Sequence, residues 1–236
     1  MVIVSKRKAV VLLLFVFLAS ISVVVLHRDE RSAFSQAPTK CIIIDAGHGF
    51  PDGGAIGMNG TIESTLNLKI ALTVENFLKE KGYRVIMTRS DENSLSGEGK
   101  TISEKKRNDM NKRLDIINNS HADIFVSIHM NKYSDSRYRG AQVIYSSNFS
   151  QSETLAALIQ HKLCELSENK SKRTHLQASK SLYLLKNANI PAVIVECGFL
   201  SNFEEEQLLI TEDYRKKLAK AIVSGIENYY KKEYPS

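Results

Sequence analysis

The chain has 236 residues, enough for one well-buried domain, and its sequence shows no internal repeat. Its formal net charge is +6, but residues 1–36 hold five Lys or Arg against two acids, which leaves 27 basic and 24 acidic residues, or +3, for the remainder. No stripe of Lys and Arg interleaved with aromatic residues accompanies this charge, so it does not indicate nucleic-acid binding. Mild positive charge suits an anionic polymer or a membrane surface.

The N-terminal segment predicts export. Lys6, Arg7 and Lys8 precede an apolar run over residues 9–26. This run is longer than the roughly 7–15 apolar residues of a cleaved signal and long enough to span a bilayer, which takes about 17–25 residues, so a signal peptide and a membrane anchor both remain open. Positive charge before the run places the following domain outside the cytoplasm. We therefore divide the chain into residues 1–36, a signal peptide or membrane anchor with a short linker, and a folded domain over residues 37–236.

Short apolar, β-branched runs predict six strands, at residues 41–45, 83–88, 124–128, 141–145, 181–185 and 192–196. Helical spacing of apolar residues lies between and after them, at Leu66–Phe77, Leu155–Leu166 and Leu218–Tyr229, and a further helix is expected over about residues 104–118. Strands alternating with helices predict an α/β fold. We expect a single domain with a mainly parallel, roughly six-stranded sheet flanked by helices on both faces, preceded by the N-terminal hydrophobic segment.

Two segments, residues 90–106 and 169–180, are rich in polar and charged residues and predict loops. Each could be a solvated surface loop or a lip that selects substrate. Cys41, Cys164 and Cys197 have no metal-ligand spacing, and their odd number forms no closed disulfide set. We expect all three to be buried as small apolar residues.

Four side chains at or near the ends of these elements are candidates for chemistry: His48, Glu63, His129 and Glu196. Three of them stand at or just past the end of a predicted strand, and Glu63 lies where the first helix begins. Sites in parallel sheets gather beyond the carboxyl ends of the strands, so all four residues are expected at one edge.

Two His and one carboxylate with an open fourth position are typical of zinc hydrolases, and His48, Glu63 and His129 satisfy that set. Zinc lowers the pKa of a bound water from 15.7 to roughly 7 and polarises the carbonyl under attack. Glu196 ends an apolar strand that would raise its pKa, which suits a proton shuttle. Asp45 could orient a ligand imidazole, although an Asp at a strand end also serves as a turn or cap residue.

A non-haem iron oxygenase uses the same kind of ligand set, so these ligands alone do not name the metal. Such oxygenases usually have a β-jelly-roll, whereas this sequence alternates strands and helices.

Several ordered motifs carry a resemblance to a known family. They are Asp45-Ala46-Gly47-His48-Gly49 with Asp52, Glu63 with Asn67, Thr88-Arg89, Arg113, Ala122 to His129 with Asn131, Gly140, and Pro191 to Asn202. With these motifs the chain, over about residues 40–230, resembles the zinc-dependent N-acetylmuramoyl-L-alanine amidases of the Amidase_3 family. The resemblance implies one Zn²⁺ per chain on His48, Glu63 and His129, with Glu196 as the catalytic carboxylate. Asn131 and Lys180 are candidates for substrate contacts.

The reaction implied is hydrolysis of the amide between the lactyl group of N-acetylmuramic acid and L-alanine in peptidoglycan. The N-terminal segment, Gly97-Glu98-Gly99 and Arg139-Gly140-Ala141-Gln142 resemble the germination-specific members of the family in spore-forming bacteria. That resemblance implies action on spore cortex peptidoglycan as a step toward muramic-δ-lactam, in the forespore intermembrane space, with a sporulation lipoprotein as a conceivable partner.

Two alternatives stay open at this point: a vegetative cell-wall amidase, and a non-catalytic wall-binding protein on the same fold. The chain also departs from the usual family motif. Phe50 and Pro51 follow His48-Gly49 where a second glycine is common, which affects the local turn rather than the ligand set.

Overall fold

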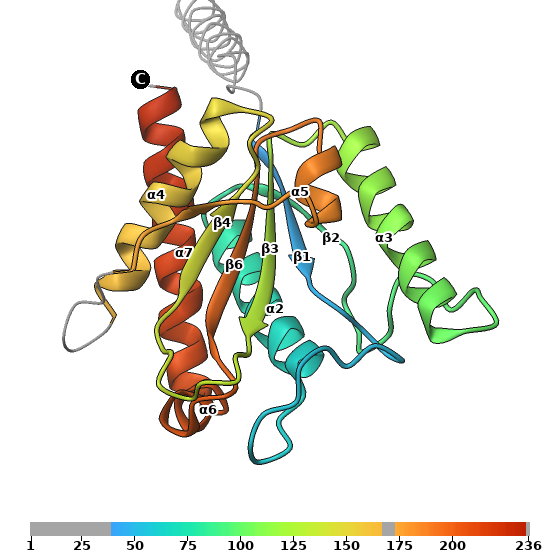
Figure 1. Cartoon of the computed structure of the whole chain (residues 1–236). Helices are drawn as coiled ribbons and strands as arrows, with labels where there is room; N and C mark the ends of the chain where they lie inside the picture. The colour runs from blue at the N-terminus through green and yellow to red at the C-terminus, as the bar shows by residue number, and fades with distance from the viewer. Residues whose placement is uncertain (1–38, 167–172, 235–236) are drawn as a thin grey trace, which may run out of the picture. The chain divides into compact units, whose positions relative to one another are not determined.

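The computed structural model describes residues 39–166 and 173–234. A six-stranded sheet with the order β2-β1-β3-β6-β4-β5 forms its centre (Figure 1). The strands are β1 (Cys41–Ala46), β2 (Arg84–Met87), β3 (Ile124–Asn131), β4 (Gln142–Tyr145), β5 (Leu176–Gln177) and β6 (Ala192–Phe199). Every neighbouring pair is parallel except β4 with β6, which is antiparallel. The predicted α/β fold with a mainly parallel sheet is confirmed.

Helices cover both faces of the sheet. They are α2 (Glu63–Glu80), α3 (Ile102–Asn119), α4 (Ser150–Cys164), α5 (Tyr183–Asn187), α6 (Phe203–Leu209) and α7 (Glu212–Glu233). Apolar residues of α2, α4 and α7 pack in one core cluster with Ile42 and Ile44, while residues of α3 and α5 pack in a second with Cys41 and Ile43. Successive residues of β1 thus point to opposite faces, which explains why its first four residues, Cys41 to Ile44, are all apolar.

Helix α3 begins at Ile102, two residues before the expected start at about residue 104. The Thr101 hydroxyl accepts from the backbone N–H of Glu104, and the Glu104 carboxylate accepts from the backbone N–H of Thr101. This capping box fixes the helix start at Ile102. The loop expected over residues 90–106 therefore ends before α3, and the last part of that range is helix.

The strand expected over residues 181–185 is wrong. Leu184 and Leu185 lie in the short helix α5 and are buried against the second core cluster. A short apolar run satisfies a strand and a buried helical turn equally, so periodicity could not separate them. The sixth strand is instead the two-residue β5, which pairs with β4. It lies within residues 169–180, the segment expected to be a loop.

The signal or anchor expected over residues 1–36 lies outside the described residues. Within residues 39–166 and 173–234, no helix has the length and apolar character needed to cross a membrane. Cys41 and Cys197 are buried as expected, whereas Cys164 is half-buried.

Candidate active site

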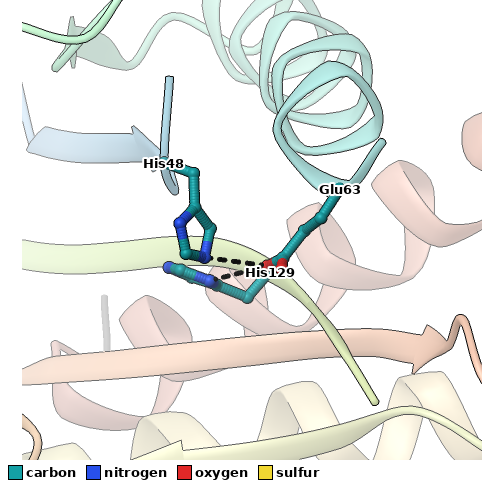
Figure 2. Close-up of side chains that lie close together, drawn as sticks. All are labelled: His48, Glu63 and His129. Atoms are coloured by element: carbon teal, nitrogen blue, oxygen red, sulfur yellow. Dashed lines mark hydrogen bonds and ion pairs between the residues drawn. The ribbon is translucent and has the colours of Figure 1, made fainter. Parts of the chain in front are cut away.

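Three predicted ligands converge at the carboxyl edge of the sheet (Figure 2). The Glu63 Oε1 atom lies 3.3 Å from His48 Nε2 and 3.0 Å from His129 Nδ1. One possible ligand atom from each residue falls within 4.8 Å of the others. The structure therefore brings together the three side chains that the sequence places on separate segments.

Each of these side chains is fixed by the element that carries it. His129 lies in β3, and Glu63 is the first residue of α2. The Glu63 carboxylate accepts from the backbone N–H groups of Ala55 at 2.7 Å and Met130 at 3.1 Å, which sets its orientation. His48 follows β1 in a left-handed conformation with φ 62°, uncommon for a residue other than glycine.

Two buried arginines hold the backbone on which His48 stands. The Arg113 guanidinium donates to the carbonyl oxygens of Ala46 at 3.0 Å and His48 at 2.6 Å. Arg89 donates to the carbonyl oxygens of Ala46 at 2.8 Å and Gly47 at 3.0 Å. Three successive carbonyl groups are thus satisfied by side chains, and this pairing holds the turn in its strained conformation.

Two glycines leave room for the predicted ligands. A Cβ atom at Gly47 would lie 2.1 Å from His129 Nε2, and one at Gly54 would lie 2.5 Å from a Glu63 carboxylate oxygen. Gly54 also has a φ of +70°, which L side chains rarely adopt. The two imidazoles and the carboxylate can approach one another because both positions lack a side chain.

Hydrogen bonds and charge set the protonation of this cluster. Burial would raise the pKa of Glu63, but its contacts with His129 and His48 outweigh burial and hold that pKa well below the usual range. Burial acts to lower the pKa of His48, yet the carboxylates of Asp52 and Glu63 raise it to about 9. Both pKa shifts arise because the Glu63 carboxylate lies between the two imidazoles and neutralises positive charge on them.

The donor set fits a divalent metal ion. Two imidazole nitrogens and one carboxylate oxygen are ligands that zinc accepts, with one position left for water or substrate. The Asp52 carboxylate lies 2.9 Å from His48 Nδ1, so the Nε2 atom faces Glu63. A carboxylate on the second ring nitrogen is the usual support for a ligating histidine.

Glu196 stands on β6 beside this cluster. It is the register partner of His129 on β3, and residues paired across neighbouring strands share a face of the sheet. Its Oε2 atom is buried and has no hydrogen-bond partner among the described residues. Burial raises the pKa of the Glu196 carboxyl to about 7, against an opposing effect of His129 and with support from Glu63. A carboxyl that titrates near neutrality can both accept and donate a proton.

Among the described residues, no hydrogen bond joins Asp45 to either imidazole. It is buried, and its carboxylate accepts from Arg113, Thr88 and Ser127. Burial alone would raise its pKa, but Arg113 and the two hydroxyls together hold that pKa below the ordinary value. The carboxylate that orients His48 is Asp52, which the sequence analysis includes only within a family motif. Its spacing of four residues from His48 is the signal that could have found it.

The two candidate substrate contacts lie apart from one another in the fold. Asn131 ends β3, where its side-chain oxygen accepts from the backbone N–H of Lys132 at 2.8 Å. Lys180 is exposed in the turn before α5. Neither lines the cavity beside the imidazoles, and their roles remain predictions.

Comparison with known proteins identifies the family. The sequence profile of the N-acetylmuramoyl-L-alanine amidases matches residues 42–228. The chain belongs to this amidase family. Its α/β fold and this membership exclude the iron oxygenase alternative, and the protein is an N-acetylmuramoyl-L-alanine amidase that acts on peptidoglycan.

Individual relatives resemble this amidase over most of their length. The germination-specific N-acetylmuramoyl-L-alanine amidase of Bacillus subtilis is 38% identical over 195 residues, which are 81% of this chain and 80% of the relative. The CwlD amidase of Clostridioides difficile, solved in complex with the GerS lipoprotein, is 41% identical with a TM-score of 0.78, and the match covers 81% of this chain and 98% of that one. The catalytic domain of CwlV from Bacillus (Paenibacillus) polymyxa is 33% identical with a TM-score of 0.69, over 81% of this chain and 98% of that domain.

Proposed function

We propose that this amidase binds one Zn²⁺ ion through His48, Glu63 and His129 and uses Glu196 as its catalytic acid and base. The observation that carries the proposal is the convergence of two imidazoles and one carboxylate beside the buried Glu196 carboxyl. When bound, zinc supplies Lewis acidity that activates water and polarises the amide carbonyl.

The proton transfers fall to Glu196. The Glu196 carboxylate accepts the proton of the attacking water and then donates a proton to the nitrogen of the leaving alanine. Burial raises the pKa of this carboxyl to about 7, so near neutrality it can both hold and release a proton. Asp52 bonds to His48 Nδ1 and so holds the ring with its other nitrogen, Nε2, toward Glu63. The negative charge of Glu63 balances part of the charge of the zinc ion.

The substrate we propose is spore cortex peptidoglycan, cleaved between the lactyl group of N-acetylmuramic acid and L-alanine as a step toward muramic-δ-lactam. Similarity to the germination-specific amidase of Bacillus subtilis and to CwlD of Clostridioides difficile supports this choice. In this proposal residues 37–236 form the catalytic domain. Residues 1–36 deliver it to the forespore intermembrane space, on the cortex side, as a cleaved signal or an anchor.

A lipoprotein partner is part of the proposal, because the related CwlD amidase was solved with the GerS lipoprotein. Metal binding is coupled to folding of the site, so a partner that stabilises the folded site would raise its affinity for zinc. Zinc content of the chain purified alone and together with a co-expressed sporulation lipoprotein tests the idea. Equal zinc content and no co-purification would remove the partner from the proposal.

Digestion of isolated cell walls tests the reaction and the substrate together. The full-length chain is added to cortex peptidoglycan and to vegetative sacculi, and the products are identified by mass spectrometry. We expect glycan strands with free lactyl groups and peptides that begin with L-alanine, in greater yield from cortex. Greater yield from vegetative sacculi would favour the vegetative amidase.

The substitution Glu196→Gln should lower the rate of peptide release by about 10²- to 10⁴-fold, because it removes the proton-transfer group without removing a ligand. Zinc content, measured by atomic emission, should equal that of the wild type. Glu204→Gln, an exposed acid on α6, is the matched control and should leave both values unchanged. Normal peptide release by Glu196→Gln would take the acid–base role away from this residue.

A further inference from the structure

A cavity of about 320 Å³ opens beside the two histidines, on the side of the sheet covered by α3 and α5. This volume lies in the range of small-ligand pockets. His48 and His129 border it at one end, and the rest of its wall is largely apolar, with contributions from Ile102, Met110, Leu182, Leu184 and Ile194. A molecule in this cavity would therefore contact the metal ligands and a hydrophobic wall at once.

Most charges along the cavity are already paired. Arg113 bonds to Asp45 and to Asp109, whose other oxygen accepts from the backbone N–H of Leu95 at 2.7 Å. The ammonium group of Lys106 lies 2.8 Å from Asp52. These pairs leave neither Arg113 nor Lys106 available without breaking an existing contact.

Lys105 is different. It lines the same cavity and is half-buried, and within residues 39–166 and 173–234 its ammonium group has no ion pair or side-chain hydrogen bond. An ammonium group that has no counter-ion and lies at the wall of a largely apolar cavity can pair with an anion bound there. The cavity thus offers one cation to a ligand.

One of the two sides of the substrate matches the cavity in polarity and charge. On the sugar side of the scissile amide, N-acetylmuramic acid presents an acetamide and hydroxyl groups, which are uncharged. On the alanine side, the stem peptide presents aliphatic carbon and carboxylates. An apolar wall with a single available ammonium group complements the peptide and not the sugar.

We propose that this cavity receives the stem peptide beyond the scissile amide and that Lys105 binds one of its carboxylates. The inference rests on the proposed function, because it takes the muramoyl-alanine amide as the bond cleaved at the histidines. Lys106 does not share the role, since its partner Asp52 also supports His48. Lys105 can therefore recognise substrate without disturbing the metal ligands.

Binding of the product peptide tests the assignment without relying on catalysis. Calorimetry on the full-length chain in detergent compares two L-alanyl stem peptides, one with free carboxylates and one with all carboxylates converted to carboxamides. Lys105→Gln should weaken binding of the first peptide by about 10- to 100-fold, the range for a hydrogen bond to a charged group. Binding of the carboxamide peptide should change little. Lys105→Arg keeps the charge and should restore most of the affinity.

Lys112→Gln is the matched control, because Lys112 is exposed on the same helix and lies outside the cavity. Equal weakening of both peptides by Lys105→Gln, or no weakening of either, would overturn the subsite, as would failure of the wild type to bind the carboxylate peptide. Charge-dependent binding through Lys105 in a protein that releases no peptide from peptidoglycan would keep the subsite and overturn the proposed function instead.

Discussion

Gly47 lies against the ring of His129, one of the predicted ligands. Its missing side chain leaves the space that the His129 ring fills, and its φ is not in the left-handed region, so alanine is compatible with the backbone. The substitution Gly47→Ala should therefore act by steric displacement of His129. Supporting residues of metal sites typically change affinity by about 10- to 100-fold, and we expect a loss of zinc affinity of that size.

Competition with a zinc chelator measures this affinity directly. Gly97→Ala is the control, because a Cβ there meets nothing within 4 Å and the residue has no positive φ. An unchanged zinc affinity in Gly47→Ala would show that the His129 ring does not hold the ion in the conformation described here.

At the scale of single residues, the sequence predicts which side chains meet better than it predicts what supports them. His48, Glu63 and His129 follow from their places at strand and helix ends, which a parallel sheet must bring to one edge. The sequence makes Asp45 a candidate for orienting an imidazole, with a turn or cap role as the alternative, whereas in the structure its carboxylate accepts from Arg113. The choice between Asp45 and Asp52 depends on the left-handed turn at His48, and residue types alone do not encode that turn clearly.

At the scale of elements, the ion pair between β1 and α3 joins the sheet to its covering helix. Asp45 and Arg113 are both buried, at 1% exposure each. Removing one partner from such a pair costs about 3–5 kcal/mol, because the other charge stays buried without its counter-ion. We expect Asp45→Asn to lower the free energy of unfolding at pH 7 by an amount in this range.

The pH dependence of that loss has a defined sign. The pKa of Asp45 is lowered in the folded state, so its contribution is complete above the ordinary carboxyl pKa of about 3.9 and is lost as the pH falls through the folded value. Urea unfolding between pH 7 and pH 3 should show the difference between wild type and Asp45→Asn narrowing toward the acid end. Asp115→Asn, an exposed acid on α3, should track the wild type throughout. A constant difference would mean that Asp45 does not titrate in this window.

Elements with strong patterns are predicted well, and short ones are not. Helix α7 follows from the spacing of Leu218, Ile222 and Ile226, all of which are buried. The short apolar run at residues 181–185 predicts a strand, but a run of this length fits a buried helical turn equally well, and the structure has helix α5 there. Its helical form is decided by packing of Leu184 and Leu185 on the sheet, a tertiary effect outside the reach of local sequence.

For the whole molecule, the three predicted ligands join segments that are far apart in the chain. Their sites are complete only in the folded state, so a bound ion stabilises folding by mass action, about 2.7 kcal/mol when the free ion is 100 times its Kd. We expect removal of zinc by a chelator to lower Tm by roughly 5–10 °C for a domain of this size. His129→Ala is the control, and its Tm should not respond to the chelator. An equal drop in both proteins would place the stabilising ion elsewhere.

The position of the ligands within the strand order has a consequence for hydrogen exchange. Strands β1, β3 and β6 each have a neighbour on both sides, whereas β2 and β5 lie at the edges and β5 is only two residues long. Amides in edge strands exchange through local opening, while those in central strands exchange through opening of the whole domain. The predicted ligands His48 and His129, together with Glu196, belong to or directly follow the central strands. Local opening of the edge strands β2 and β5 therefore leaves the positions of His48, His129 and Glu196 unchanged.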